Sequence, residues 1–354
     1  MKKSMMAAVF RVSKGLVIEE VPVPGLEKDQ VLVKVADVGF CGSDHSMLES
    51  GNLRDGYIVG HEVSGTISAV GSDVRGVAEG LRVIIRPTFC GTCPDCQTGR
   101  PYFCQNNRRS IGIGDLPGAF AEYFVAYPQM LIPVPDGVDS RNAALAEAFA
   151  ASLHAINCSG RDRGSALVLG GGPIGLATIM LLKMKGFSPV SLSEPVAAKR
   201  ILGRRIGADH VVDPVAEDLG QHAFLATGGD GFGTVFECAG VKSLLQQGLD
   251  LASRGGVVCV VSVIYDVAEI SPATLNFKEV ALTGSYSNTH LENRQCLAWM
   301  AAGKLDGRVL ISDEISLEQL PLIYKERICT CLLYTSPSPR DFKYDLVCRL
   351  MVEK

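Results

Sequence analysis

A run of four cysteines is the pattern in this sequence with the most direct chemical meaning. The spacing is Cys90-x2-Cys93-x2-Cys96-x7-Cys104, and glycines and a proline between the cysteines allow the chain to turn. Structural zinc sites take four tetrahedral ligands, often all cysteine thiolates, and are closed to substrate. We therefore predict that the loop 90–104 holds a structural zinc ion through these four side chains. Chance clustering of reduced thiols, or two disulfides, is the alternative.

A second group of metal-ligand residue types is spread along the chain. Cys41 lies in the segment Gly-Phe-Cys-Gly-Ser-Asp, and His61 lies in Gly-His-Glu. A catalytic zinc needs about three protein ligands and an open position, and thiolate and imidazole are donors that zinc prefers. Glu62 or Glu147 can be the third ligand or can hold the metal-bound water, and the sequence leaves that choice open. Taken singly, Cys41 and His61 are more simply explained as members of a packed core, and Glu147 as a helix carboxylate at a domain boundary.

A glycine-rich segment has the form of a dinucleotide-binding loop. Residues 170–175 match G-x-G-x-x-G, with Gly170, Gly172 and Gly175 in the glycine positions and Pro173 and Ile174 between the last two. The segment follows a buried strand and opens a helix, which is the context that the motif needs. The helix N-terminus would offer N–H groups to the phosphates of NAD. An ordinary tight turn is the alternative explanation.

An acidic residue after the next strand indicates which cofactor is bound. Glu194 lies nineteen residues after Gly175, at the expected end of the second strand of this region. A carboxylate there accepts hydrogen bonds from the ribose hydroxyls and repels a 2′-phosphate, so we expect NAD in preference to NADP. Lys199 and Arg200 follow in the next helix, and we expect them to face solvent. A solvated carboxylate at a strand end is the alternative for Glu194.

The elements that must position these residues fall into two patterns. The first third of the chain is β-rich, with strands expected at 31–35 and 63–67, and an alanine-rich helix is expected at 142–156. From residue 165 strands and helices alternate, which favours a doubly wound parallel sheet and an α/β fold class. Strands are expected there at 166–169, 190–192, 211–212, 235–238 and 257–261, with helices at 174–185 and 197–206.

Length, charge and cysteine content restrict the classes of protein. With 354 residues the chain exceeds what one hydrophobic core normally serves, so two domains are expected. A net charge of -4 lacks the basic footprint of a nucleic-acid-binding protein. The apolar stretch 166–182 is interrupted by glycines, which argues against a membrane span, and residues 1–10 have no apolar run long enough for a signal peptide. We expect a cytoplasmic protein that binds neither nucleic acid nor membrane.

Taken together, the motifs resemble one known family, the zinc-containing medium-chain dehydrogenases. Within that family the sequence is most similar to the polyol branch, which includes sorbitol, butanediol and threonine dehydrogenases. The resemblance covers about residues 6–327. It rests on the segments 38–44, 60–62, 90–104, 118–123, 147–154 and 170–175.

The resemblance implies an architecture. A Rossmann doubly wound domain at 156–288 would bind NAD and be inserted in a β-rich GroES-like catalytic domain. That catalytic domain would span 1–155, with the structural zinc loop 90–104, and would continue at 289–327. Residues 328–354 would form an atypical tail. The assembly would be a homo-dimer or homo-tetramer.

The resemblance also implies residue roles. Cys41 and His61 would bind a catalytic zinc, which acts as a Lewis acid on an alcohol substrate, so each chain would hold two zinc ions. Glu62 would be a neighbouring or alternate ligand, and Glu147 matches the glutamate of the polyol branch. Ser43 would relay the hydroxyl proton of the substrate.

Three positions depart from the family pattern. Ala148 stands where the polyol branch has a proline after its glutamate, and Ser46 stands where the family often has a histidine, with His45 one place early. The change at position 46 affects the outer proton relay that the resemblance implies. After Arg327 the sequence fits nothing in the family and lacks a recognisable returning strand. It resembles translated adapter or vector sequence or a frameshift.

The function expected from these features is NAD-linked oxidation of a small secondary alcohol or polyol by a zinc-dependent enzyme. Threonine 3-dehydrogenase-like activity is an alternative within the same branch. A zinc-free quinone or enone reductase is a second alternative, and the cysteine and histidine motifs argue against it. A catalytically damaged nucleotide-binding protein is a third, and the tail is its main support.

Overall fold

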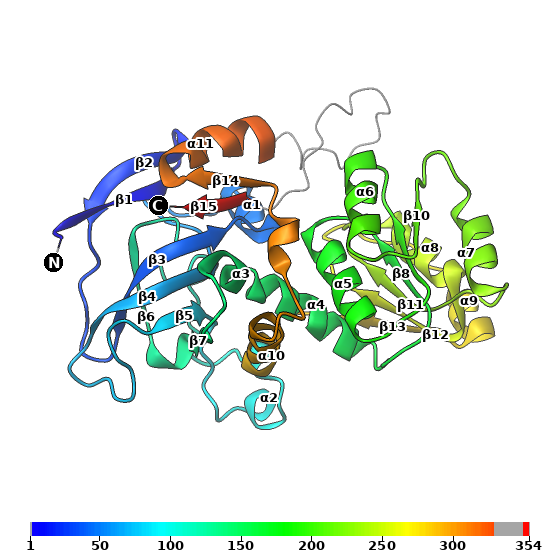
Figure 1. The fold of residues 1–354 in the computed structure, drawn as a ribbon, viewed down its shortest axis with the longest axis horizontal. Coiled ribbons are helices and arrows are strands. Elements are labelled where there is room, and N and C mark those ends of the chain that lie inside the picture. Colours follow the sequence, from blue (N-terminus) through cyan, green and yellow to red (C-terminus); the bar gives the residue numbers. More distant parts are fainter. Residues whose placement is uncertain (1, 329–349, 354) are drawn as a thin grey trace. The chain divides into compact units, whose positions relative to one another are not determined.

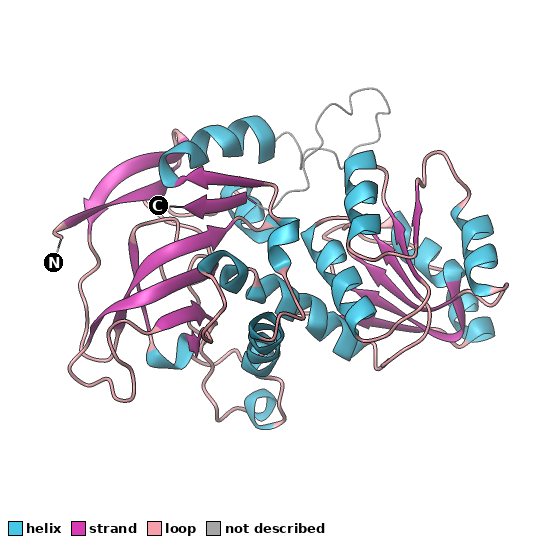
Figure 2. Cartoon of the chain, in the orientation of Figure 1, coloured by secondary structure: helices cyan, strands magenta, loops and turns pink. Residues whose placement is uncertain are grey.

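The computed structural model describes residues 2–328 and 350–353, and these fall into two compact units (Figures 1 and 2). Unit 1 comprises residues 2–147, 289–328 and 350–353, and unit 2 comprises residues 148–288. Unit 2 is thus inserted in the sequence of unit 1, as an inserted nucleotide domain would be. The domain boundary that we expect at 155/156 stays a prediction, and the compact units divide after Glu147.

Unit 1 is built on antiparallel strands. A hairpin of β1 (Ser4–Arg11) and β2 (Gly15–Pro22) stands beside a seven-stranded sheet with the order β14-β15-β3-β4-β5-β7, in which β6 also pairs with β3. The strands of this sheet are β3 (Val31–Gly39), β4 (Glu62–Val70), β5 (Arg82–Ile85), β6 (Tyr123–Ala126), β7 (Leu131–Pro133), β14 (Asp313–Ser316) and β15 (Leu350–Glu353). The β-branched residues of β3 and β4 pack into one core, as such residues favour a pleated, half-buried surface.

The C-terminal end of the chain supplies a strand that the sequence analysis did not find. β15 pairs in parallel with β14 and antiparallel with β3, so it lies between them in the sheet. The expected absence of a returning strand was therefore wrong for residues 350–353. The rest of the expected atypical tail, from residue 329 to 349, lies outside the described residues.

Short helices connect and flank the strands of unit 1. They are α1 (Gly42–Glu49), α2 (Pro94–Gln97), α3 (Ser140–Ala144), α10 (His290–Ala301) and α11 (Leu320–Ile323). The sequence analysis expected no helix at α1. The helix expected at 142–156 is divided at Leu145 into α3 and α4 (Ala146–Cys158).

Unit 2 is the predicted doubly wound domain. Its six strands are all parallel, in the order β10-β9-β8-β11-β12-β13. Numbered from β8 as the first, this is the order 3-2-1-4-5-6 of dinucleotide-binding domains, which reverses direction between β8 and β11. The strands are β8 (Ala166–Leu169), β9 (Val190–Ser193), β10 (His210–Val212), β11 (Phe232–Glu237), β12 (Ala252–Val260) and β13 (Ala281–Gly284).

Helices alternate with these strands and bury them. They are α5 (Pro173–Met184), α6 (Ala197–Arg205), α7 (Leu219–Thr227), α8 (Ser243–Leu251) and α9 (Pro272–Lys278). β8 and β9 are buried along their whole length, which explains why their sequences are continuous apolar or small-residue runs rather than alternating ones.

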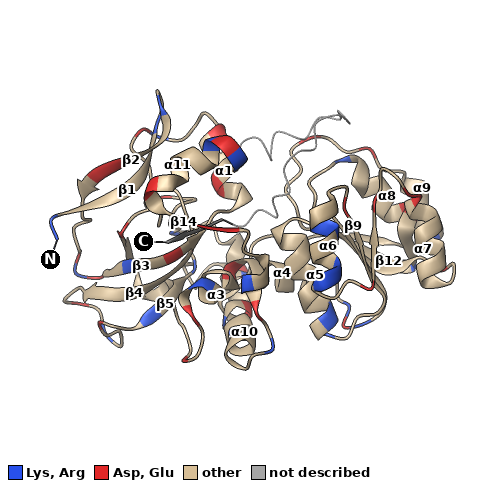
Figure 3. Cartoon of the chain, turned by 45° about the horizontal axis from the view of Figure 1, so that its top comes forward, with Lys and Arg blue, Asp and Glu red and all other residues tan. Residues whose placement is uncertain are grey.

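Charged residues of both signs are interspersed along both units, apart from a group of basic residues on α6 (Figure 3). No helix among the described residues has the length and apolar character that crossing a bilayer requires.

Candidate functional site

Three of the predicted metal ligands meet in unit 1. The donor atoms of Cys41, His61 and Glu62 all lie within 4.8 Å of one another. Cys41 is the residue before α1, and His61 and Glu62 stand at the start of β4. The antiparallel pairing of β3 with β4 sets Gly39 opposite Glu62, so the sheet register brings the two segments together. Thiolate, imidazole and carboxylate are a donor set that zinc accepts.

Gly39 leaves the space that the Glu62 carboxylate occupies. A Cβ atom at position 39 would lie 2.5 Å from Oε2 of Glu62, closer than non-bonded atoms can approach. Any larger residue there would displace the carboxylate from Cys41 and His61. Gly39 is therefore required by the position of the Glu62 carboxylate.

Asp44 is a functional residue to which the sequence analysis gave no role. Its side chain is fully buried and accepts hydrogen bonds from the backbone N–H groups of Cys41 at 2.9 Å and Gly60 at 3.0 Å. It also lies 3.0 Å from Nδ1 of His61. A carboxylate at Nδ1 fixes the proton there and leaves Nε2 as the donor for a metal. Its position three residues after Cys41, in the first turn of α1, is a capping-box spacing that could have revealed it.

The electrostatics of the group favour a bound cation. Burial raises the pKa of the Cys41 thiol, and the charge of Glu62 raises it further. Burial lowers the pKa of His61, but the charge and hydrogen bond of Asp44 outweigh this and hold that pKa well above its usual value. A divalent cation among these groups would stabilise the thiolate and would replace the proton on Nε2, so the residues present fit a zinc ion.

Ser43 lies beside this group. Its Oγ is 3.3 Å from Nε2 of His61, and the residue is exposed. A hydroxyl that touches the metal-ligand group and also reaches solvent has the position that a proton relay needs. His45 points elsewhere, because its Nδ1 lies 3.1 Å from the Tyr324 hydroxyl, which donates to Glu49 at 2.8 Å.

Glu147 is not a member of the group of donors within 4.8 Å of one another. Its Oε1 instead accepts from Nη1 of Arg86 at 3.1 Å, and the Arg86 side chain is only 4% exposed. The sequence analysis did not foresee this partner, since Arg86 directly follows β5 and is distant from Glu147 in sequence. The geometry thus favours Glu62 over Glu147 as the third ligand.

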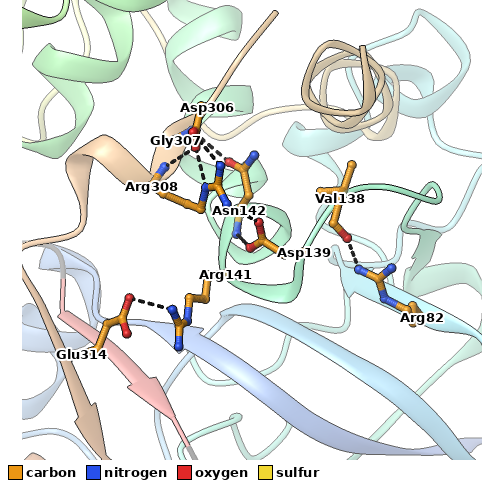
Figure 4. Close-up of polar contacts among 9 residues, drawn as sticks. All are labelled: Arg82, Val138, Asp139, Arg141, Asn142, Asp306, Gly307, Arg308 and Glu314. Atoms are coloured by element: carbon orange, nitrogen blue, oxygen red, sulfur yellow. Dashed lines mark hydrogen bonds and ion pairs between the residues drawn. The ribbon is translucent and has the colours of Figure 1, made fainter. Parts of the chain in front are cut away.

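The segment that leads to Glu147 is anchored to the returning part of unit 1 (Figure 4). Asp139 caps α3 by accepting the Asn142 N–H at 2.9 Å and pairs with Arg308 at 3.0 Å. The Asn142 amide oxygen accepts the Gly307 N–H at 2.9 Å. Figure 4 also shows the ion pair of Arg141 with Glu314 and the bond from Arg82 to the Val138 carbonyl oxygen.

The four cysteines of the loop 90–104 form a second candidate metal site. Their Sγ atoms all lie within 4.8 Å of one another. With Zn–S bonds of about 2.3 Å, a tetrahedral site sets its sulfurs about 3.8 Å apart. The Sγ atoms of Cys90 and Cys96 are 3.9 Å apart, which fits that geometry.

Hydrogen bonds within the loop prepare Cys90 as a thiolate. Thr92 and Cys93 donate backbone N–H groups to its Sγ at 3.4 and 3.3 Å, and the Thr92 hydroxyl donates at 3.6 Å. These donors, led by the Thr92 hydroxyl, lower the pKa of Cys90 to about 6. Burial raises the pKa of Cys96 to about 12. A bound zinc ion would remove this difference between the pKa values of Cys90 and Cys96, because it would hold all four cysteines of the loop as thiolates.

The glycine loop of unit 2 joins β8 to α5. Gly170 has φ +100°, and a Cβ atom at Gly175 would lie 2.0 Å from the Gly170 carbonyl oxygen, so both positions require glycine. A Cβ atom at Gly172, which caps α5, would meet nothing within 4 Å. Open space over the second glycine, at the first turn begun by Pro173 and Ile174, is what an approaching pyrophosphate needs.

Glu194 follows β9 and is only 5% exposed. Its Oε2 accepts the Gly171 N–H at 2.6 Å, and its Oε1 accepts the Val196 N–H at 2.8 Å. The carboxylate therefore supports the glycine loop, a contact that the sequence analysis did not predict. Each oxygen keeps a further lone pair with which it can accept from a ribose hydroxyl.

The expectation that Arg200 faces solvent was wrong. Its guanidinium donates to the carbonyl oxygens of Glu194 and Pro195 at 2.8 and 2.6 Å and pairs with Asp213 at 2.9 Å. These contacts tie α6 to the ends of β9 and β10, so Arg200 supports the loop that carries Glu194.

Comparison with known proteins decides the family. The model of the alcohol dehydrogenase GroES-like domain matches residues 27–136, and that of the zinc-binding dehydrogenase matches residues 173–302. Sorbitol dehydrogenase of Bacillus subtilis (strain 168) is 30% identical over 329 residues, covering 90% of this chain and 92% of that protein. The chain belongs to the zinc-containing medium-chain alcohol and polyol dehydrogenases. The fold class and the family resemblance expected from the sequence are thereby confirmed.

Two further relatives of this medium-chain dehydrogenase bear on its activity. L-threonine 3-dehydrogenase of Pyrococcus horikoshii is 32% identical over 263 residues, covering 72% of this chain and 74% of that protein. A putative zinc-binding dehydrogenase of Sinorhizobium meliloti 1021, crystallised with NADP, is 32% identical, with a TM-score of 0.86 and complete coverage of both chains. The protein is an oxidoreductase that acts on small alcohols with a nicotinamide cofactor.

Proposed function

We propose that this dehydrogenase oxidises a secondary alcohol or polyol with NAD and a zinc ion held by Cys41, His61 and Glu62. The observation that carries the proposal is this donor group itself, in which the buried Asp44 fixes His61 in the tautomer that can bind a metal. A zinc-free reductase on the same fold would have no use for such a group.

The residues around the group would divide the work. A zinc ion, when bound, supplies a Lewis acid that lowers the pKa of an alcohol. Ser43 would relay the hydroxyl proton of the substrate: Oγ accepts it while the serine's own hydroxyl proton leaves toward solvent, which its exposure allows. Asp44 holds Nδ1 of His61 protonated throughout. Glu147 stays paired with Arg86 and does not bind the metal.

We further propose a second, structural zinc ion in the loop 90–104. All four donors there are protein thiols, so the coordination shell would be complete without water or substrate. This ion would contribute to stability and take no part in the chemistry.

For the cofactor we propose NAD rather than NADP. The support is Glu194, whose buried carboxylate lies beside the glycine loop, where a 2′-phosphate would meet like charge. Because the related Sinorhizobium structure contains NADP, the preference between the two cofactors has to be measured directly.

We propose a homo-dimer as the smallest assembly and the cytoplasm as its location. β13 ends the sheet order of unit 2, and its outer edge has no partner strand among the described residues. Its Leu282 is 39% exposed, and an open apolar edge is a template for pairing with a second copy. Free thiols at the described cysteines suit a reducing compartment. Light scattering after size-exclusion chromatography measures the mass of the assembly. The same measurement on Leu282→Lys tests whether the β13 edge forms the dimer contact.

The central experiment measures NAD reduction at 340 nm with a panel of substrates. The panel holds sorbitol, butane-2,3-diol, L-threonine and a primary alcohol, with zinc content determined on the same preparation. We expect turnover with at least one secondary alcohol or polyol and its loss on treatment with a chelator. Preference for L-threonine would place the activity in the threonine branch. Reduction of quinones or enones by the reduced cofactor, without oxidation of any alcohol, would refute the proposal.

A further inference from the structure

Glu237 is a buried carboxylate at the carboxyl end of β11 that binds two different loops. Its side chain is fully buried, and Oε1 accepts the backbone N–H groups of Ala239 at 2.9 Å and Gly240 at 2.8 Å. The Ser262 hydroxyl, which follows β12, donates to Oε2. These three donors are neutral, and together they offset part of the cost of burying a charge.

The backbone of Glu237 strengthens the same connection. Its carbonyl oxygen accepts the N–H groups of Val261 at 2.9 Å and Ser262 at 3.2 Å. One residue therefore holds the loop after β11 (residues 238–240) against the loop after β12 (residues 261–262). Side chain and main chain act on the same two loops, so neither loop can shift without breaking contacts with Glu237.

The loop after β11 also packs against the glycine loop. The Cys238 N–H donates to the Leu169 carbonyl oxygen at 2.9 Å. A Cβ atom at Gly170 would lie 2.9 Å from Cβ of Ala239, so the two backbones touch at the point where the sheet order reverses. The loop after β11 therefore lies against the start of the glycine loop, on the β11 side of the point where the sheet order reverses.

The sheet order tells which half of a dinucleotide these loops face. All six strands are parallel, so their carboxyl ends lie along one edge, and a dinucleotide crosses that edge between β8 and β11. Glu194, after β9, marks the adenosine half on the side of β9 and β10. The loops after β11 and β12 lie on the other side of the crossing and therefore belong to the nicotinamide half.

We propose that Glu237, with Ser262, is a positioning residue that fixes the loops after β11 and β12 in the shape that receives the nicotinamide half of the cofactor. The proposal rests on the proposed function only in taking the cofactor to be a nicotinamide dinucleotide. Glu237 would not touch the reacting atoms. A carboxylate suits this role because both of its oxygens accept hydrogen bonds and its charge strengthens them, whereas the amide of glutamine offers the two backbone N–H groups only a neutral acceptor.

The test compares binding of the whole cofactor with binding of AMP, its adenosine half. Dissociation constants for NADH and for AMP are measured by calorimetry on the wild type, Glu237→Gln and Ser262→Ala. Asp209→Asn is the matched control. Asp209 also accepts a backbone N–H, from Val190 at 2.7 Å, but it stands at the opposite edge of the sheet, before β10.

We expect Glu237→Gln to weaken NADH binding about tenfold, because a neutral amide makes weaker hydrogen bonds to the two loops than the carboxylate does. AMP binding should stay within about twofold, because its contacts lie on the side of β8 and β9. Ser262→Ala should also weaken NADH binding, by a smaller factor. Asp209→Asn should leave the ratio of the two dissociation constants unchanged. Turnover number should fall in Glu237→Gln along with NADH affinity.

Equal weakening of both ligands, or unchanged NADH affinity, would overturn the proposal. Retained AMP binding shows that a variant is folded, and Ser262→Ala provides the answer if Glu237→Gln does not fold. Failure of the proposed function is a separate result: a wild type that binds both ligands but oxidises no alcohol refutes the activity, while the two affinities still decide the role of Glu237.

Discussion

Asp44 illustrates how a single buried carboxylate prepares a metal ligand. It binds the backbone of Cys41 and Gly60 and the Nδ1 atom of His61, so it connects both ligand-bearing segments at once. The energetic cost of burying it is offset by three donors, one of them on a group that its own charge helps to keep protonated. The ligand geometry thus depends on a residue that need not touch the metal.

Replacement of Cys41 by alanine tests the catalytic group at this scale. We expect Cys41→Ala to lower kcat/KM by at least about a thousandfold, or about 4 kcal/mol, because one ligand of the open site is lost. Zinc content should fall from two ions per chain to one, while the unfolding midpoint stays near that of the wild type. Cys158→Ala, which removes a half-buried thiol outside both cysteine groups, is the control. An active Cys41→Ala enzyme would disprove the assignment.

Glu194 allows a prediction about cofactor choice. We expect the wild type to prefer NAD over NADP by at least about tenfold in kcat/KM, or about 1.4 kcal/mol. Glu194→Ser should narrow or reverse that ratio by removing the charge beside a 2′-phosphate. Because Glu194 also accepts the Gly171 and Val196 N–H groups, both absolute values should fall, so the ratio is the quantity to compare.

Steady-state kinetics with both cofactors on wild type, Glu194→Ser and Glu194→Gln supplies the measurement. The glutamine variant loses the charge but keeps an acceptor for one of the two backbone N–H groups, so it weakens the support of the glycine loop less than Glu194→Ser does. A wild type that prefers NADP, or a ratio that none of the changes moves, would exclude Glu194 as the selector.

At the scale of elements, the cysteine loop shows how a segment with little regular structure acquires a fixed shape. α2 has only four residues, and none of its residues is buried, so packing contributes little there. The thiol of Cys104 is the exception, since that residue is buried at the end of the loop. A metal ion that binds four thiolates would supply the free energy that an apolar core supplies elsewhere.

Cys93→Ala should therefore lower stability more than it lowers activity. We expect loss of one zinc ion per chain and a fall in the unfolding midpoint of at least about 5 °C, while the turnover of the folded fraction at low temperature stays near wild type. Thr92→Ala is the matched control, because it removes a hydrogen-bond donor to Cys90 from the same loop and leaves all four ligands in place. A Cys93→Ala protein with two zinc ions and an unchanged midpoint would contradict the assignment.

At the scale of the whole molecule, two strands from the C-terminal part of the chain complete the seven-stranded sheet of unit 1. β14 and β15 come after the inserted unit 2, yet they join a sheet whose other strands all precede residue 134. β15 and β4 both pair with the segment of β3 next to Cys41, and in β15 Met351 lies opposite Gly39. The last described residues of the chain thereby support the strand that carries the first ligand segment.

Deletion of residues 350–354 should destabilise unit 1. β15 pairs on both sides, so its loss opens an edge on β3 and another on β14, at a cost on the order of 2–4 kcal/mol in hydrogen bonds alone. Chemical denaturation of the truncated and full-length proteins measures this, with a chain that lacks only Lys354 as the control. Equal stability of both chains would show that β15 is dispensable.

Several features could be predicted from the sequence because they depend on residues close together in the chain. The glycine loop, the four-cysteine loop and the alternation of strands and helices after residue 165 are local patterns, and the doubly wound sheet follows from that alternation. The need for glycine at positions 170 and 175 could be predicted in the same way, because it depends on backbone geometry within one turn.

Other features depend on contacts between distant segments, which only the tertiary structure decides. The register of β3 with β4 brings Glu62 to Cys41 and His61, whereas Arg86 pairs with Glu147 across 61 residues of sequence and keeps it apart from that group. The contact of Asp44 with His61, the support that Glu194 gives the glycine loop and the place of β15 arise in the same way. Hydrogen bonds and ion pairs of this kind form wherever folding happens to bring partners together, so residue type and spacing do not reveal them.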